Sequence, residues 1–258
     1  MKSKRIVYYQ DLLADEFVAT PKKLKSIVGD YQYINKSLLH RFGAFIAYRL
    51  IATPIAFIYT KLIRRIKFVN KKVLKPYKKQ GYFIFANHTH PQADAFTPNI
   101  IVFPKRNYTV VNASNVSLPI LGRRTELLGA LPLPADLKST KNFLKAIETR
   151  FKQGFSITIY PEAHLWPFYT KIRPFQDQSF KYPAKLDAPV FTFTTSYQTH
   201  RNKRLKTIIY IDGPFIAPAS LTIREKQMYL HQSAISAMRA RALNSDYEKI
   251  IYLPKEQS

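Results

Sequence analysis

The chain has 258 residues, which suits one α/β domain of ordinary size with an appended element. Hydrophobic residues make up 46% of it, enough for a buried core, and the absence of cysteine excludes disulfide bonds and cysteine-based zinc sites. Its 41 lysines and arginines outnumber the 16 acidic residues and give a formal charge of +25, so we expect an anionic partner: a phospholipid surface, a nucleic acid or an acidic protein.

Residues 1–36 show no chemical motif. We expect an N-terminal arm here, with a short helix around residues 11–18 that ends near Pro21. The basic start, Met1 to Arg5, is not followed by an apolar stretch with a small-residue cleavage site, so the sequence predicts no secretory signal.

Residues 37–66 form a long apolar segment that predicts a helix capped by Ser37 and kinked or split at Pro54. Apolar side chains such as Phe57 dominate it, while a polar stripe follows one side at helical spacing: Arg49, Thr53, Thr60 and Arg64. The segment is long enough to span a bilayer, but an arginine near its middle would then be costly. A helix lying in the membrane interface fits better, and an ordinary core-facing helix is the third alternative.

A basic run follows the apolar segment. It includes Arg64, Arg65, Lys71 and Lys75. Basic residues beside an amphipathic segment are typical of proteins that bind anionic lipid, where each contributes roughly 1 kcal/mol, although a solvated connecting helix is also consistent. We interpret residues 37–79 as membrane-association helices and residues 80–258 as the α/β domain, and Arg49, Phe57, Arg64, Arg65, Lys71 and Lys75 as membrane-binding residues.

The segment 82–96 carries the clearest chemical signal. An aromatic and β-branched run, residues 82–86, predicts a short buried strand that ends at Asn87-His88, and a helix is expected to follow with Asp94 in its first turn. A carboxylate that holds Nδ1–H of His88 would leave Nε2 facing a substrate hydroxyl as a general base. The alternatives are a capping Asp94 beside a loop histidine, or His90 as the base.

The rest of the chain predicts alternating strands and helices, hence an α/β fold with a mixed central sheet flanked by helices. The helix over 139–153 is the clearest, with Ser139 as its cap and Gly154 as its stop. The expected strands are 82–86, 107–112, 127–131, 155–160, 189–195 and 206–211, and the other expected helices are 93–101, 115–124 and 221–243.

Four short blocks occur in a fixed order over roughly residues 80–195. They are Asn87-His88 with Asp94; Leu118–Gly122 followed by Leu127–Pro132; Ile157–Glu162, a strand that ends in Tyr-Pro-Glu; and Ala188–Phe193, a strand marked by a proline. In this order the blocks resemble those of the glycerolipid acyltransferases, the family of 1-acylglycerol-3-phosphate acyltransferases.

Two departures from the family pattern affect what the resemblance implies. The family usually has four residues between its histidine and aspartate, whereas this chain has five, Thr89 to Ala93. The family usually continues its third block as Glu-Gly-Thr-Arg, but Glu162 is followed here by Ala-His-Leu, so the arginine associated with the acceptor's phosphate is absent. Arg173, Arg123 and Arg124 are candidates to replace it.

The resemblance implies a membrane-surface O-acyltransferase of phospholipid biosynthesis. It would carry an acyl group from acyl-CoA or acyl-acyl carrier protein to a lysophospholipid, converting 1-acylglycerol 3-phosphate to phosphatidic acid, with no bound cofactor or metal. His88 and Asp94 would be catalytic, and Asn87, Glu162 and His164 would contact substrate. The expected location is the cytoplasmic face of the cell membrane, as a peripheral or monotopic protein.

A binding protein without catalytic activity is the alternative. It would use the same fold to bind anionic lipid or nucleic acid. However, the sequence has no RNA-recognition signature, helix-turn-helix or zinc pattern, and nucleic-acid binding would leave the apolar segment unexplained, so no nucleic-acid partner is expected.

Overall fold

The computed structural model describes residues 4–18, 26–117, 122–200 and 204–255. Its centre is a seven-stranded sheet in the order β2-β8-β7-β3-β6-β4-β5. Only β7 and β8 pair in antiparallel fashion, so the sheet is mixed, as predicted. The strands are β2 (Lys67–Val69), β3 (Tyr82–Ala86), β4 (Asn107–Val111), β5 (Ala130–Pro132), β6 (Ser156–Ile159), β7 (Val190–Thr199) and β8 (Leu205–Phe215).

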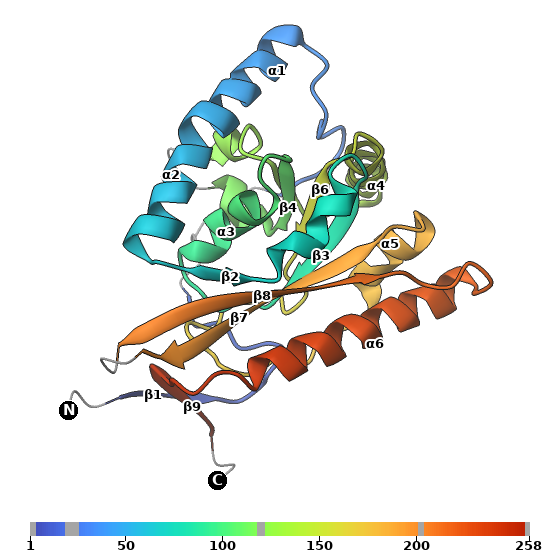
Figure 1. Cartoon of the computed structure of the whole chain (residues 1–258). Coiled ribbons are helices and arrows are strands. Elements are labelled where there is room, and N and C mark those ends of the chain that lie inside the picture. The colour runs from blue at the N-terminus through green and yellow to red at the C-terminus, as the bar shows by residue number, and fades with distance from the viewer. Residues whose placement is uncertain (1–3, 19–25, 118–121, 201–203, 256–258) are drawn as a thin grey trace.

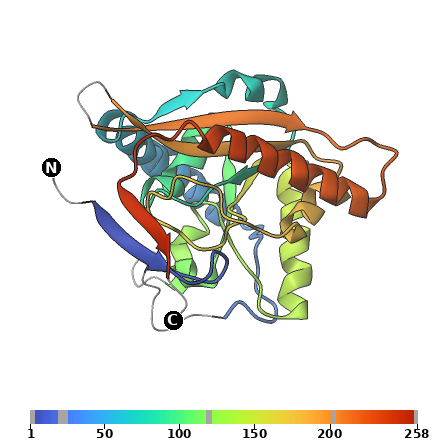
Figure 2. The same cartoon turned by 90° about the horizontal axis from the view of Figure 1, so that it is seen from below.

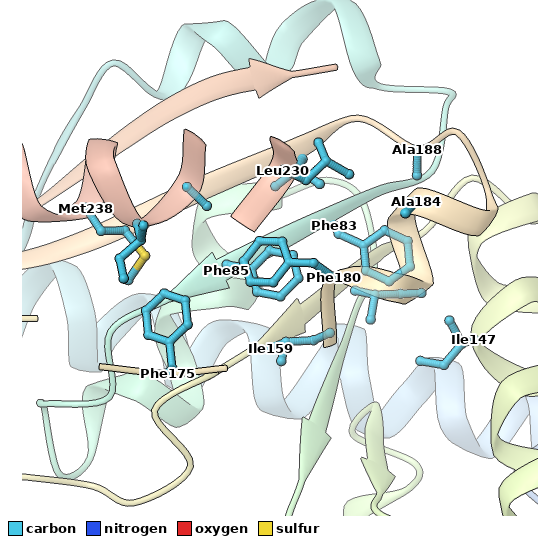
Figure 3. Packing of buried hydrophobic residues seen from close by; sticks show 14 of the residues in the cluster. Phe83, Phe85, Ile147, Ile159, Phe175, Phe180, Ala184, Ala188, Leu230 and Met238 are labelled. Atoms are coloured by element: carbon cyan, nitrogen blue, oxygen red, sulfur yellow. The ribbon is translucent and has the colours of Figure 1, made fainter. Parts of the chain in front are cut away.

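Strand β3 lies near the middle of the sheet and is buried along its whole length. Phe83 and Phe85 point to the face covered by α4 (Leu137–Lys152), α5 (Lys181–Lys185) and α6 (Ile223–Ala242). Figure 3 shows Phe85 stacked on Phe180, with ring centroids 3.7 Å apart. The alternate residues Tyr82, Ile84 and Ala86 point to the opposite face, which is covered by α3 (Ala93–Val102) and by the N-terminal helix described below (Figure 1).

Most expected elements are present, and two of them differ in detail. β5 begins only at Ala130, because residues 125–129 are occupied by turns in which Leu128 and Gly129 donate backbone hydrogen bonds to Thr125 and Glu126. Helix α4 is capped by Asp136, not by Ser139; Ser139 lies at the third helical position, and each side chain bonds the other's backbone N–H. Gly154 does end the helix region, with a positive φ of 80°.

Two predicted helices are not found. Residues 113–117 and 122–125 form the short 3-10 turns η4 (Ala113–Ser117) and η5 (Gly122–Thr125), where a helix over 115–124 was expected, and residues 118–121 of the second block lie outside the described residues. In the N-terminal arm, residues 12–14 form a turn, because the side chain of Asp11 accepts the N–H groups of Leu13 and Ala14 and competes with helix formation. Pro21 lies outside the described residues.

The two ends of the chain form a small sheet of their own that the sequence analysis did not anticipate. β1 (Arg5–Tyr9) pairs in parallel with β9 (Ile250–Pro254). Figure 2 shows these strands side by side and apart from the main sheet. The N-terminal arm is therefore held against the end of the chain, although nearly the whole sequence lies between the two strands.

The N-terminal helix runs without a break from Leu38 to Ile63, as α1 (Leu38–Phe45), the π-helical η1 (Ile46–Ala52), α2 (Thr53–Phe57) and the π-helical η2 (Ile58–Ile63). The predicted split at Pro54 does not occur. Pro54 lies at the start of α2, where the wide turns of η1 end and a missing N–H is tolerated. By length and composition this helix could cross a membrane.

The threonines of its polar stripe face inward, and many of its apolar residues face outward. Thr53 and Thr60 are buried, and their hydroxyl groups donate to backbone carbonyl oxygens of the same helix, those of Tyr48 and Ala56. Leu50 and Leu62, by contrast, are 63% and 61% exposed. This arrangement is the reverse of an ordinary surface helix and excludes the core-facing alternative.

The proposed membrane-binding cations are not all at the surface. Arg64, Arg65 and Lys75 are exposed. Arg49 donates a hydrogen bond to the carbonyl oxygen of Pro104, and half-buried Lys71 donates to that of Ile100 at 2.7 Å. Arg65 and Lys75 therefore remain available to an anionic surface. Arg64 is exposed but donates to Tyr59 and Gln92, and Arg49 and Lys71 are partly engaged with the rest of the protein.

Candidate active site

The candidate site lies where β3 and β6 end. Both strands are parallel, so the residues that follow them meet at the same edge of the sheet. His88 follows β3, Glu162 follows β6, and Asp94 lies in the first turn of α3. Because β3 and β6 are neighbours in the sheet, His88 and Glu162 come together although they are 74 positions apart in sequence.

His88 and Asp94 are in direct contact. Nδ1 of His88 lies 2.8 Å from Oδ2 of Asp94, and an ionised carboxylate only accepts hydrogen bonds, so Nδ1 carries the proton and Nε2 is the free base. Nε2 has no hydrogen-bond partner within the described part of the chain, and 26% of the His88 side chain is exposed. The tautomer that a general base needs is thus set by this contact.

The extra loop residue is accommodated by the same carboxylate. Oδ2 of Asp94 also accepts the backbone N–H groups of Thr89 and His90, each at 3.0 Å. The loop wraps around Asp94, which is 3% exposed. Five intervening residues therefore still allow the histidine–aspartate contact, because the additional residue is folded into a turn held by Asp94.

Glu162 lies beneath the histidine and is paired with Arg173. Oε2 of Glu162 accepts the backbone N–H of His88 at 3.2 Å, and Oε1 accepts the N–H of Arg173 at 3.1 Å. The Arg173 guanidinium lies 3.4 Å from the carboxylate and donates to the carbonyl oxygens of Glu162 and His164. Burial raises the pKa of Glu162, and the nearby Arg173 charge opposes that rise.

This geometry changes the interpretation of two predicted substrate contacts. Arg173 is only 1% exposed, its donors are directed at protein carbonyl groups, and its guanidinium lies over the ring of Trp166. Glu162 is 5% exposed. Both side chains bond to protein groups beside His88, and their role in binding substrate stays a prediction.

The other residues predicted to bind substrate have the following positions. The Asn87 amide donates to the carbonyl oxygen of Thr195 at 3.0 Å and accepts its N–H at 2.8 Å, so Asn87 joins β3 to β7 and is buried. Nδ1 of His164 lies 3.9 Å from a carboxylate oxygen of Glu16. Arg124 is exposed in η5, while the side chain of Arg123 lies outside the described residues.

His90, the alternative base, is buried, and its Nδ1 accepts the N–H of Ala93 at 3.2 Å. Burial lowers the pKa of His90, and the nearby Asp94 charge opposes that fall. Nδ1 of His90 is thus engaged within the loop, whereas His88 has the side-chain contact with Asp94 and the open nitrogen.

Trp166 organises the loop that carries Glu162, a role that its local sequence does not predict. Its backbone N–H donates to the carbonyl oxygen of His88 at 3.1 Å, and its indole N–H donates to that of Asp15 at 2.8 Å. Its ring stacks on Tyr252 of β9, with centroids 5.1 Å apart. The paired ends of the chain thus hold this loop, through contacts between residues more than 80 positions apart that no local pattern encodes.

Two further cations lie beside the site. Arg64 donates to the side-chain oxygen of Gln92, directly before α3, at 3.4 Å. The ammonium group of Lys249 lies 3.8 Å from the ring centroid of Phe168, whose backbone N–H donates to Thr89. Both cations are exposed, and neither has an acidic partner among the described residues. The described residues also contain no His, Cys, Asp and Glu group suited to hold a metal ion.

Comparison with known proteins places this chain among the acyltransferases. The model of the Acyltransferase family matches residues 65–196, which is about half of the chain, so this protein belongs to that family and the predicted family resemblance is confirmed. The fold is similar to the crystal structure of the 1-acyl-sn-glycerophosphate acyltransferase PlsC from Thermotoga maritima, with a TM-score of 0.54 and 16% identity, over 81% of this chain and 88% of that one. No curated protein sequence matches this chain significantly.

Proposed function

We propose that this acyltransferase carries a fatty acyl group from an acyl thioester to the hydroxyl group of a lysophospholipid, most simply 1-acylglycerol 3-phosphate, in phospholipid biosynthesis. The contact of 2.8 Å between His88 and Asp94, with Nε2 left open, carries the proposal. Membership of the acyltransferase family gives the reaction type, and the similar fold of PlsC supports the choice of acceptor.

The proposed reaction needs only one proton carrier. Nε2 of His88 takes the proton of the acceptor hydroxyl as its oxygen attacks the thioester carbonyl carbon. The new C–O bond forms, the C–S bond breaks, and the departing thiolate receives the proton from the imidazolium. Asp94 accepts a hydrogen bond from Nδ1–H throughout and stabilises the imidazolium. Glu162, Arg173 and Asn87 act by positioning the backbone of His88.

Arg64 and Lys249 are proposed to receive the acceptor's phosphate. They are exposed, lack acidic partners among the described residues, and flank the loop that carries His88. These two cations come from distant parts of the sequence. Together they would supply the positive charge that the arginine of the family's third block supplies in other members. This assignment replaces Arg173, which is buried and whose two terminal nitrogens already donate to protein carbonyl groups.

The N-terminal helix is proposed to lie in the membrane interface at the cytoplasmic face. Its outward residues are apolar, and it ends at Ile63, directly before Arg64. A lipid substrate held at this surface would therefore enter beside the candidate site. The donor, acyl-CoA or acyl-acyl carrier protein, is anionic in either case and is attracted by the formal charge of +25.

The test is release of thiol from an acyl thioester in the presence of a lysophosphatidate. We expect turnover by the native protein and none above background with His88→Ala, while circular dichroism shows an unchanged fold. Native activity in His88→Ala would refute the assigned base. No turnover with any lysolipid, together with retained vesicle binding, would favour the non-catalytic lipid-binding alternative.

A further inference from the structure

A cleft lies away from the candidate active site. Its volume is about 1070 Å³, slightly above the roughly 300–1,000 Å³ typical of small-ligand sites. It is bounded by the start of the N-terminal helix, by β4 and β5 and by the end of α4. Arg106 directly precedes β4 and Phe155 directly precedes β6, whereas His88 follows β3. The cleft is therefore at the opposite end of these parallel strands.

The cleft is lined by an unusual number of guanidinium groups. The guanidinium carbons of Arg106 and Arg150 lie 5.2 and 4.6 Å from the ring centroid of Tyr108. Arg41 and Arg49 line the same cleft from the helix. None of these four arginines has an acidic partner among the described residues. The acid that does line the cleft, Glu126, accepts a hydrogen bond from Tyr31.

These charges are partly withdrawn from water and incompletely paired. Nε of Arg106, Nε of Arg150 and one terminal nitrogen of Arg49 are buried without a hydrogen-bond partner within the described residues. Burial lowers the pKa of Arg150, and the like charges of Arg106 and Arg41 lower it further. Gathering like charges in this way is unfavourable unless an anion occupies the space between them.

The rim of the cleft is apolar and exposed. Leu38, Phe42 and Phe45 line it, and they are 78%, 63% and 54% exposed. They belong to the helix whose outward face we have placed in the membrane interface. A ligand for this cleft should therefore combine a phosphate, for which planar guanidinium groups are suited, with a hydrocarbon chain.

We propose that this cleft binds an anionic phospholipid, with the phosphate held by Arg41, Arg106 and Arg150 and the acyl chains lying over Phe42 and Phe45. The proposal rests on the membrane placement proposed above and not on the chemistry at His88. Such a lipid would fix the orientation of the protein on the bilayer, because it is held at the end of the helix far from the candidate active site.

Isothermal titration with a short-chain phosphatidylglycerol below its critical micelle concentration tests the proposal without a bilayer. We expect one-to-one binding by the native protein and about tenfold weaker binding by Arg41→Gln and by Arg150→Gln, since each loses charged hydrogen bonds. Lys145→Gln, which removes an exposed charge from the surface of α4, should bind as the native protein does. Equal affinity in all four proteins, or no binding to the native protein, would overturn the proposal.

The same titration with coenzyme A tests whether the cleft binds the phosphates of the acyl donor and not those of a phospholipid. Coenzyme A binding that requires Arg41 and Arg150, without phosphatidylglycerol binding, would assign the cleft to the acyl donor and overturn the lipid assignment. Short-chain phosphatidylcholine, which is zwitterionic, should bind at least about tenfold more weakly than phosphatidylglycerol. Because Arg41 is exposed, Arg41→Gln decides the outcome if Arg150→Gln does not fold.

Discussion

Glu162 accepts a hydrogen bond from the backbone N–H of His88 at 3.2 Å, so the end of β6 is tied directly to the end of β3. The same carboxylate is held from its other side by Arg173. The glutamate of the third block therefore contacts the histidine of the first block through the backbone, and Arg173 is part of this support.

Loss of Glu162 should reduce stability and activity together. Glu162→Gln leaves the buried charge of Arg173 without its counter-charge, which typically costs about 3–5 kcal/mol. Urea unfolding monitored by Trp166 fluorescence measures this loss. The double variant Glu162→Gln Arg173→Met should regain part of the stability but not the activity, because His88 still lacks its backbone support. Unchanged stability in Glu162→Gln would contradict the buried pair.

Substitution of Asp94 tests whether its carboxylate supports His88 as the general base. In Asp94→Asn, a neutral amide replaces the carboxylate that accepts hydrogen bonds from Nδ1–H of His88 and from the loop N–H groups. These bonds become weaker, so kcat should fall by about 100- to 10,000-fold, the usual range for general-base catalysis. The loss should be smaller than that of His88→Ala, because Asp94 supports the imidazole and does not itself take the proton. Steady-state thiol release gives kcat, and unchanged kcat in Asp94→Asn would argue against the pair.

The sequence was sufficient for features encoded locally. The buried run 82–86, the aspartate in the first turn of α3 and the amphipathic α4 each depend on neighbouring residues, and each was placed within a few positions. The mixed sheet followed from their alternation and is confirmed. The catalytic roles of His88 and Asp94 stay a prediction, although their contact is present.

What the sequence could not provide depends on pairing between distant segments. β1 and β9 lie at opposite ends of the chain, and Trp166 contacts both of them. The true partners of Arg173 are carbonyl groups and a buried carboxylate, which no spacing rule indicates. Arg64 and Lys249 likewise lie beside the loop of His88 only because the fold places them against Gln92 and Phe168.

Removal of the Lys249 charge should affect phosphate-bearing acceptors selectively. With Lys249→Gln we expect KM for 1-acylglycerol 3-phosphate to rise about tenfold, since a hydrogen bond to a charged group is lost, while KM for a monoacylglycerol stays unchanged. Lys185→Gln, which removes an exposed charge from the end of α5, is the matched control. An equal rise for both acceptors would indicate weaker attraction to the membrane and would remove the phosphate assignment.

Membrane attachment should depend on the outward face of the N-terminal helix. Leu50→Ser Leu62→Ser removes two exposed apolar side chains whose transfer into lipid is worth about 1–2 kcal/mol each, so partition into phosphatidylcholine vesicles should fall by more than about tenfold. Vesicle flotation measures the partition. High salt should not change the difference between the variant and the native protein, because the transfer of apolar side chains is not screened by ions. Leu243→Ser is the matched control: Leu243 is 87% exposed but follows α6. If Leu243→Ser weakens flotation as much as the double variant, attachment is not specific to this helix, and the interfacial placement is wrong.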